Sequence, residues 1–345
     1  MFIQKTFSFI GLMRFAGHHF VWLFLWMSAP VLLFYFFDFK YAFIPWLPVS
    51  IMGTAVAFYV GFKNNQSYDR LWEARKIWGA IVNSSRAWGS TVKGFISDDF
   101  GTDKSEKELS EIVTKLIHAQ IAWLYQLRKQ LLVPVPWEHI ALNNKMMRRF
   151  SAKRIKTFGL GLVEDQEIDL MIHNCLSDEI CNRIKNSSNS ATAIIDIQSS
   201  ALKALRKDKV IDDFRHMELQ KILNDFYVHQ GKCERIKKFP FPRQYANMSV
   251  IFIAIFMVLL PLGTVMEYAK LGPWGIWASI FTNVIIGWVF VVMELVGDYS
   301  ENPFEGMGND IPMLSICRTI EIDLREMLDE GDIPAPIRAV NNVLM

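Results

Sequence analysis

Apolar residues along this chain gather in four long runs that are almost free of charge and are separated by polar segments. A helix needs about 20 apolar residues to cross the hydrocarbon core of a bilayer. Three of the runs reach that length, and Pro30 in the first is tolerated where neighbouring helices satisfy the carbonyl that it frees. The sequence therefore predicts membrane-spanning helices at His19 to about Phe37, Val49–Phe62, Tyr245 to about Met266, and Leu271–Val296.

The second run, Val49–Phe62, is shorter than a span exposed to lipid requires. A polar and aromatic helix pattern continues from Lys63, and no Pro or Gly follows before Gly79. A short span is acceptable if the helix is buried inside an assembly and extends beyond the membrane. We therefore expect one helix that begins in the membrane and continues out of it.

Two stripes at four-residue spacing run along this second span. The first stripe consists of small residues: Gly53, Ala57 and Gly61. The second lies beside it on a helix: Thr54, Phe58 and Phe62. Small residues let helices approach closely in a bilayer, so we expect the first stripe to pack against copies of the same helix. The second would then face a shared axis, although the spacing alone equally fits two faces of an ordinary membrane helix.

Residues 64–243, between the second and third runs, have the pattern of a soluble helical domain. Leu109, Val113 and Leu116 belong to an apolar stripe of helix period opposite charged residues, which predicts a helix over 104–132. Strand signals are few, so the fold class is predicted to be all-α, with a large cytosolic helical bundle joined to the spans. Further helices are expected at about 138–158, 164–187, 190–207 and 211–236.

The distribution of charge predicts the orientation. The short loops 38–47 and 267–272 hold two basic residues between them, while the long polar segment and both termini hold nearly all the others. By the positive-inside rule both termini are cytoplasmic, in a multi-pass protein of the inner membrane. Residues 1–18 lack the features of a removable signal peptide. The predicted segments are 1–18 (cytosolic), 19–63 (spans one and two), 64–243 (cytosolic helical domain), 244–298 (spans three and four) and 299–345 (cytosolic).

Composition excludes several classes of function. Of the 345 residues, 51% are hydrophobic, with 26 Phe and 11 Trp, too apolar a composition for a typical soluble helical protein. The net charge is +2, and no basic tract is interleaved with aromatic residues, so no nucleic-acid partner is expected. The phosphate-binding, metalloprotease and hydrolase motifs are absent from the sequence. We expect neither an enzyme nor a bound cofactor.

No metal site is expected either. His18 and His19 could ligate a metal, but polar residues at the membrane interface are the plainer interpretation. Cys175 and Cys181 stand six apart, which does not bring two ligands together on one helix face. All four cysteines, including Cys233 and Cys317, fall in segments predicted to be cytosolic, where we expect reduced thiols in packed helices.

Four blocks of sequence follow one another along the chain: GFKNNQSYDRLWEARKIWG, CERIKKFPFPRQYA, ENPF and NDIPMLSICRTIEIDLREML. Together they resemble the bestrophin family, especially its bacterial branch, and the resemblance runs from about Phe20 to about Leu328. It implies a pentameric ion channel with four membrane helices per subunit and a large cytosolic helical part. On that basis we expect a homo-oligomer, a pentamer, in the lipid bilayer.

The resemblance also implies a role for the aromatic stripe. In the family, three apolar residues four apart on the second membrane helix form a constriction, the neck, shortly before the DRLWEAR segment. The match falls on Thr54, Phe58 and Phe62, of which Thr54 departs from the apolar pattern. Rings of apolar side chains gate a pore by dewetting, so we expect a hydrophobic neck here.

A second, cytosolic constriction is implied at Asp213 and Phe214, within VIDDFRHMELQKILNDF. Equally open is that Phe214 is the first core contact of a helix capped by Asp212 or Asp213.

The charged residues that follow the second span form either a salt-bridged helix face or the wall of a charged vestibule. They are Asp69, Arg70, Glu73, Arg75 and Lys76.

Animal members of the family carry a calcium clasp after the NPF motif, built from a run of acidic residues. Here NPFEGMGND offers Glu305 and Asp310 without such a run. Calcium takes six to eight oxygen ligands, so we expect no calcium gating.

The function we expect is passive conduction of small monovalent ions through a central pore. Family usage favours chloride and other anions, while monovalent cations are also associated with the bacterial branch. The rival class is a non-conducting membrane sensor or scaffold whose cytosolic bundle binds a partner.

Overall fold

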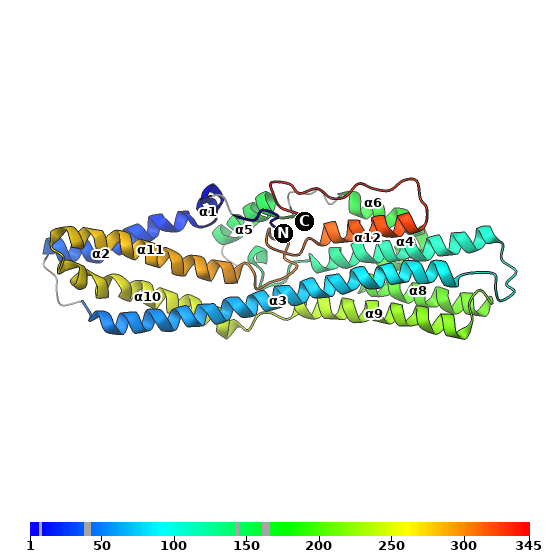
Figure 1. Cartoon of the computed structure of the whole chain (residues 1–345), viewed down its shortest axis with the longest axis horizontal. Helices are drawn as coiled ribbons and strands as arrows, with labels where there is room; N and C mark the ends of the chain where they lie inside the picture. The colour runs from blue at the N-terminus through cyan, green and yellow to red at the C-terminus, as the bar shows by residue number, and fades with distance from the viewer. Residues whose placement is uncertain (7–8, 38–42, 142–144, 161–165) are drawn as a thin grey trace. The chain divides into compact units, whose positions relative to one another are not determined.

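The structure is a computed structural model that describes residues 1–345 except 7–8, 38–42, 142–144 and 161–165 (Figure 1). The described residues are mostly helical and contain no strand, apart from isolated bridges near the two termini. The prediction of an all-α fold is confirmed. The chain divides into two compact units, which we call the apolar unit (Gln4–Arg70 and Pro240–Asn302) and the polar unit (Met1–Ile3, Leu71–Phe239 and Pro303–Met345).

The apolar unit contains the four predicted spans. Its helices are α1 (Phe9–Ala16), α2 (His18–Phe37), the first part of α3 (Trp46–Phe95), α10 (Arg243–Ala269) and α11 (Pro273–Asp298). Four helical stretches are long and apolar enough to cross a membrane: α2, α3, α11 and the stretch Asp213–Ala269, which includes α10. Asp38 and Lys40, in the first predicted loop, lie outside the described residues.

The helices of the apolar unit approach closely at small residues. A side chain at Gly263 of α10 would meet Val49 of α3 at 2.6 Å, and one at Gly287 of α11 would meet Leu23 of α2 at 3.1 Å. Buried polar groups add directional contacts, since the Asn283 amide donates to Thr264 Oγ1 at 2.8 Å between α11 and α10. Such contacts hold helices together where apolar surface alone gives no driving force.

The polar unit is a helical bundle around α4 (Glu106–Leu131). Almost every residue from Leu116 to Tyr125 is buried, as expected of a helix covered on all sides. Ser105 and Glu108 cap its start reciprocally, because Glu108 N donates to Ser105 Oγ and Ser105 N to Glu108 Oε2. The other helices are the end of α3, α5 (Lys145–Phe158), α6 (Gln166–Cys175), α7 (Asp178–Lys185), α8 (Ser190–Lys207), α9 (Asp213–Lys238), α12 (Met313–Met327) and the 3₁₀ turn η1 (His139–Ala141).

Two of the predicted helices are wrong as single elements. The segment 164–187 holds α6 and α7, because Ser177 adopts an extended backbone (φ −68°, ψ 155°) at the start of α7. The segment 138–158 holds η1 and α5. Positions 142–144 and 164–165 of these predictions lie outside the described residues.

The helix predicted to continue past Lys63 does so. α3 has 50 residues and runs through Gly79 and Gly89 to Phe95. The expected segment boundaries near residues 18, 63, 243 and 298 stay a prediction, because a compact unit does not mark where a membrane ends.

Candidate pore-lining face and the contacts behind it

The first part of α3 has one covered face and one uncovered face in the apolar unit. Its buried positions recur every three or four residues: Val49, Gly53, Val56, Val60, Lys63 and Ser67. Phe58 and Phe62 lie on the other side, with 68% and 70% of their surface exposed. These two rings are therefore not part of the core of this subunit. They form an uncovered aromatic face on a helix that can cross a membrane.

Thr54 lies on the same exposed face. Its hydroxyl donates to the carbonyl oxygen of Ser50 at 3.0 Å, so the polar hydrogen is used within the helix. This contact reduces the polarity that Thr54 adds to an otherwise apolar stripe.

The small stripe is divided between different surroundings. Gly53 is buried, and a side chain there would meet the Phe256 ring of α10 at 2.8 Å. Ala57 is half-buried, while Gly61 is exposed and has nothing within 4 Å of an added Cβ. Gly53 therefore packs inside the subunit, and only Ala57 and Gly61 are left to contact other copies of the chain. A packing role for the stripe between subunits stays a proposal.

Immediately after the aromatic face, an ion pair and a hydrogen bond join α3 to α11. Lys63 forms an ion pair with Glu294, whose Oε1 also accepts a hydrogen bond from Ser249 Oγ of α10 at 2.9 Å. The next residue, Asn64, donates to the carbonyl of Met293 at 2.9 Å. Sequence reasoning missed this pair. The available signal was that Lys63 and Glu294 are opposite charges at the ends of two predicted spans.

A second cross-helix contact follows from a proline. Pro261 in α10 has no N–H, so the carbonyl of Met257, four residues earlier, loses its helical donor. Trp26 Nε1 of α2 donates to that carbonyl at 3.0 Å. An apolar groove of about 640 Å³ lies between α2, α10 and α11, and its lining includes Trp22, Trp26, Met257 and Glu294.

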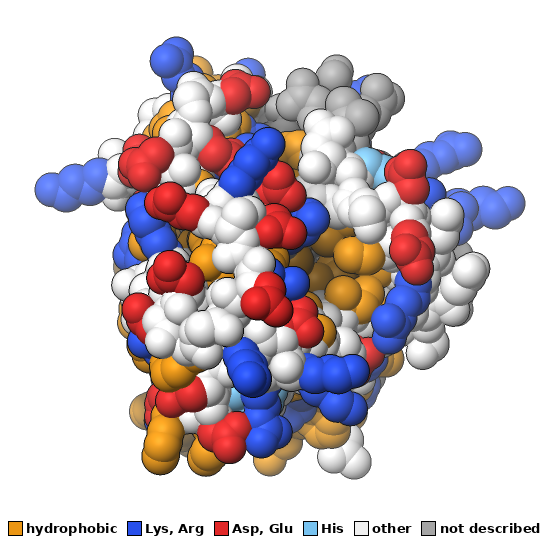
Figure 2. All heavy atoms as spheres, turned by 90° about the vertical axis from the view of Figure 1, so that its right-hand side faces the viewer, with side chains coloured by type: hydrophobic (Ala, Val, Ile, Leu, Met, Phe, Trp, Pro, Cys, Tyr) orange, Lys and Arg blue, Asp and Glu red, His pale blue; other side chains and the backbone are white. Residues whose placement is uncertain are grey.

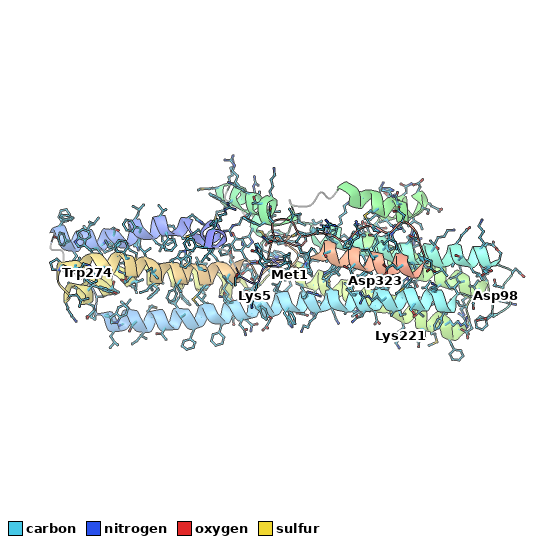
Figure 3. The ribbon with its side chains drawn as sticks, turned by 45° about the horizontal axis from the view of Figure 1, so that its top comes forward. Met1, Lys5, Asp98, Lys221, Trp274 and Asp323 are labelled. Carbon is cyan, nitrogen blue, oxygen red and sulfur yellow. The ribbon has the colours of Figure 1, made fainter. Side chains whose placement is uncertain are left out.

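Figure 3 labels Trp274 at the first turn of α11, where three quarters of its surface is exposed. An exposed Trp at the end of a span is typical of the membrane interface.

In the polar unit, Asp213 and Phe214 lie at the start of α9. Asp212 is the N-cap, because its carboxylate accepts from Arg215 N at 2.8 Å. Asp213 pairs with Arg206, and Phe214 is 80% exposed. The alternative that Phe214 is a core contact is therefore wrong, although the alternative that Asp212 caps the helix is right.

The NPF segment is held by protein donors. The Asp310 carboxylate accepts from the N–H groups of Phe304, Gly306 and Ile311 at 3.0, 2.8 and 2.7 Å. Burial raises the pKa of Asp310, and these donors oppose that shift. Glu305 accepts from the Nδ1 and the backbone N–H of His139. Both carboxylates are thus engaged within the polar unit.

Of the charged residues after the second span, Glu73 pairs with a different helix. Glu73 of α3 binds Arg235 of α9 at 2.6 Å. On the face of the polar unit in Figure 2, basic and acidic side chains are interspersed, so neither sign of charge dominates there.

All four cysteines are free and buried, as predicted. Burial raises the pKa of Cys175 and of Cys317 to about 12, so their thiols are inert at neutral pH. Cys175 and Cys181 lie on different helices, α6 and α7. His19 Nδ1 accepts from Trp22 Nε1 at 2.9 Å. Across the described parts of the chain, no three His, Cys, Asp or Glu side chains are grouped to hold a metal.

Comparison with known proteins gives consistent matches. Residues 18–326 match the family described as Bacterial/Fungal Bestrophin protein. The voltage-dependent anion channel-forming protein YneE of Escherichia coli is 28% identical over 290 residues, which cover 84% of this chain and 79% of that protein. A voltage-dependent anion channel-forming protein of Ralstonia nicotianae is 25% identical over 285 residues, covering 82% and 77%.

The crystal structure of a bacterial bestrophin homolog from Klebsiella pneumoniae has the same fold. It superimposes with a TM-score of 0.73 at 20% identity and covers 92% of this chain and 99% of that chain.

Proposed function

Because the chain belongs to the Bacterial/Fungal Bestrophin family, we propose that it is the subunit of an ion channel that conducts small monovalent ions passively. The observation that carries the proposal is the uncovered aromatic face of α3, formed by Phe58 and Phe62 with Thr54 beside them. A face of this kind on a membrane-crossing helix contacts lipid, another subunit or a pore.

The neck is the role that fits this face best. Phe58 and Phe62 are four residues apart, so each contributes a separate ring of side chains when copies of α3 surround an axis. An ion in such a ring loses hydration without a polar group to replace it. The two rings would therefore limit the flow, with Thr54 at one end of the constriction.

A closed pore needs several copies of this face. The proposed channel is a homo-oligomer, and the resemblance of its sequence blocks to the family supports a pentamer. Ala57 and Gly61, beside the aromatic face, are the small residues available for contacts between subunits. Phe214, exposed at the start of α9 beside Asp213, is proposed to form a second constriction in the cytosolic part.

Anions are the favoured ions. The relatives from Escherichia coli and Ralstonia nicotianae are named as anion channel-forming proteins, which supports chloride and similar anions over monovalent cations. We place the channel in the inner membrane with both termini cytoplasmic, since the short loops carry few basic residues. Transport through such a pore requires no covalent chemistry and no cofactor.

The proposal is tested by reconstitution of the purified protein into planar bilayers. We expect discrete single-channel currents under a salt gradient. Their reversal potential should have the sign of the anion's equilibrium potential, as for a pore that is more permeable to anions than to cations. We expect these currents even when calcium is chelated. Glu305 and Asp310, the carboxylates of the NPF segment, accept hydrogen bonds from the protein, and no calcium gating is expected. An oligomer of correct mass that passes no current at any voltage would favour the scaffold alternative.

A further inference from the structure

Lys63 is a charged residue in a position that otherwise belongs to the apolar core of the subunit. It follows Phe62 directly and continues the buried stripe of Val56 and Val60. Its side chain is 2% exposed, and that of its partner Glu294 is 12% exposed. The α3 helix therefore carries aromatic rings on one side and a buried cation on the other.

The two charges depend on each other. Taking a charge out of water is costly, and a buried pair offsets that cost only with good geometry. Ser249 donates to Glu294 Oε1, while among the described residues Glu294 Oε2 has no hydrogen-bond partner. Among the described residues, Lys63 is the only cation that forms an ion pair with Glu294.

A close helix contact fixes the same point of α3. A side chain at Gly297 of α11 would lie 2.1 Å from Asn64 Oδ1, so a larger residue there would displace the Asn64 amide. Asn64 also donates to the Met293 carbonyl at 2.9 Å. One residue corresponds to about 100° of helix rotation, because a turn has 3.6 residues. Holding Lys63 and Asn64 against α11 therefore sets the direction in which Phe62 points.

We propose that Lys63 is a positioning and selectivity-determining residue of the neck, held and neutralised by Glu294. This inference rests on the proposed channel function. The ion pair fixes the rotation of α3, and it keeps the wall behind the aromatic rings electrically neutral. Neutrality matters because a charge on the far side of α3 lies only about one helix diameter, roughly 10 Å, from an ion in the pore.

Each half of the pair, left alone, would act on permeating ions with opposite sign. At an effective dielectric constant of about 20, one unpaired charge at that distance favours ions of opposite sign by roughly tenfold and disfavours ions of the same sign by a similar factor. Glu294→Gln leaves the positive charge of Lys63 and favours anions. Lys63→Met leaves the negative charge of Glu294 and favours cations.

The test compares reversal potentials of four channels in bilayers: the parent, Lys63→Met, Glu294→Gln and the double variant. We expect shifts of at least about threefold in the anion-to-cation permeability ratio, in opposite directions for the two single variants. The double variant returns to the parent ratio.

The exposed ion pair Arg183–Asp196 of the polar unit provides a matched control. Arg183→Met should leave the permeability ratio unchanged. Conducting single variants with unchanged ratios, or with shifts of the same sign, would overturn the inference. A parent channel that passes no current would instead refute the proposed function.

Assembly gives an independent measurement. Breaking a buried pair destabilises a protein strongly, whereas replacing both partners with uncharged groups is often tolerated. If both single variants fail to assemble and the double variant assembles normally, the neutralisation of Lys63 by Glu294 is supported. A double variant that is less stable than either single variant would contradict it, because the two charges would then not depend on each other.

Discussion

At the scale of single residues, some contacts between helices of the apolar unit satisfy polar groups that a proline or a buried charge would leave without a partner. Trp26 is the clearest case, because its indole N–H replaces the donor that Pro261 withholds from the Met257 carbonyl. The contact joins α2 to α10, two helical stretches that are long and apolar enough to cross a membrane.

We predict that Trp26→Phe lowers thermal stability by about 1–2 kcal/mol, since it leaves a carbonyl oxygen without a donor. Pro261→Ala restores an N–H that can donate to Met257, so Trp26→Phe should cost little in that background. Thermal unfolding of the detergent-solubilised protein measures both effects. Additive losses in the double variant would show that Trp26 stabilises through packing alone.

Sequence patterns predicted some of these residues and not others. The four-residue spacing placed Phe58 and Phe62 on one face of a helix, and the structure shows that face uncovered. The Lys63–Glu294 pair was not predicted, because the two residues are 231 positions apart and pair only after α3 and α11 pack. The sequence also left open whether Phe214 is buried, because its burial depends on how α8 and α9 pack around the start of α9.

At the scale of elements, α3 combines a membrane span and a soluble helix in one continuous element of 50 residues. Its continuation was predictable from the absence of Pro and Gly between Lys63 and Gly79. The break between α6 and α7 was not, because Ser177 ends one helix pattern without a proline or a glycine to mark it.

The glycines of α3 separate contacts inside a subunit from contacts between subunits. Gly53→Leu should destabilise the subunit, because the new side chain overlaps the Phe256 ring. Gly61→Leu should leave the subunit folded and reduce the oligomeric mass, since no described residue lies within 4 Å of a Cβ at Gly61. Gly94→Leu, at another open position of α3, is the control and should change neither property. Unfolding temperature and mass in detergent report the two effects separately.

If Gly61→Leu assembles like the parent, this part of α3 does not face another subunit, and the small stripe has no role in assembly. If Gly53→Leu has the parent unfolding temperature, the contact with Phe256 contributes nothing to the fold.

At the scale of the whole molecule, the division into an apolar and a polar unit follows from where charged residues lie along the chain. Hydrophobic runs predicted the four spans, because length and composition decide whether a helix can cross a bilayer. The pore is a property of several chains together, and a single sequence specifies only the face that each contributes. The neck is therefore the feature on which the proposed channel depends.

The most direct test of the neck is the single-channel conductance of Phe58→Ala and Phe62→Ala, measured with thermal stability on the same preparations. A pore-lining ring that loses its bulk should pass more current and admit larger ions, with stability near that of the parent, because 68% and 70% of these side chains are exposed in the subunit. A buried Phe→Ala change would cost about 3–5 kcal/mol and lower the current. Stable variants with unchanged conductance would rule out a pore-lining role for these rings, as would unstable variants with reduced current.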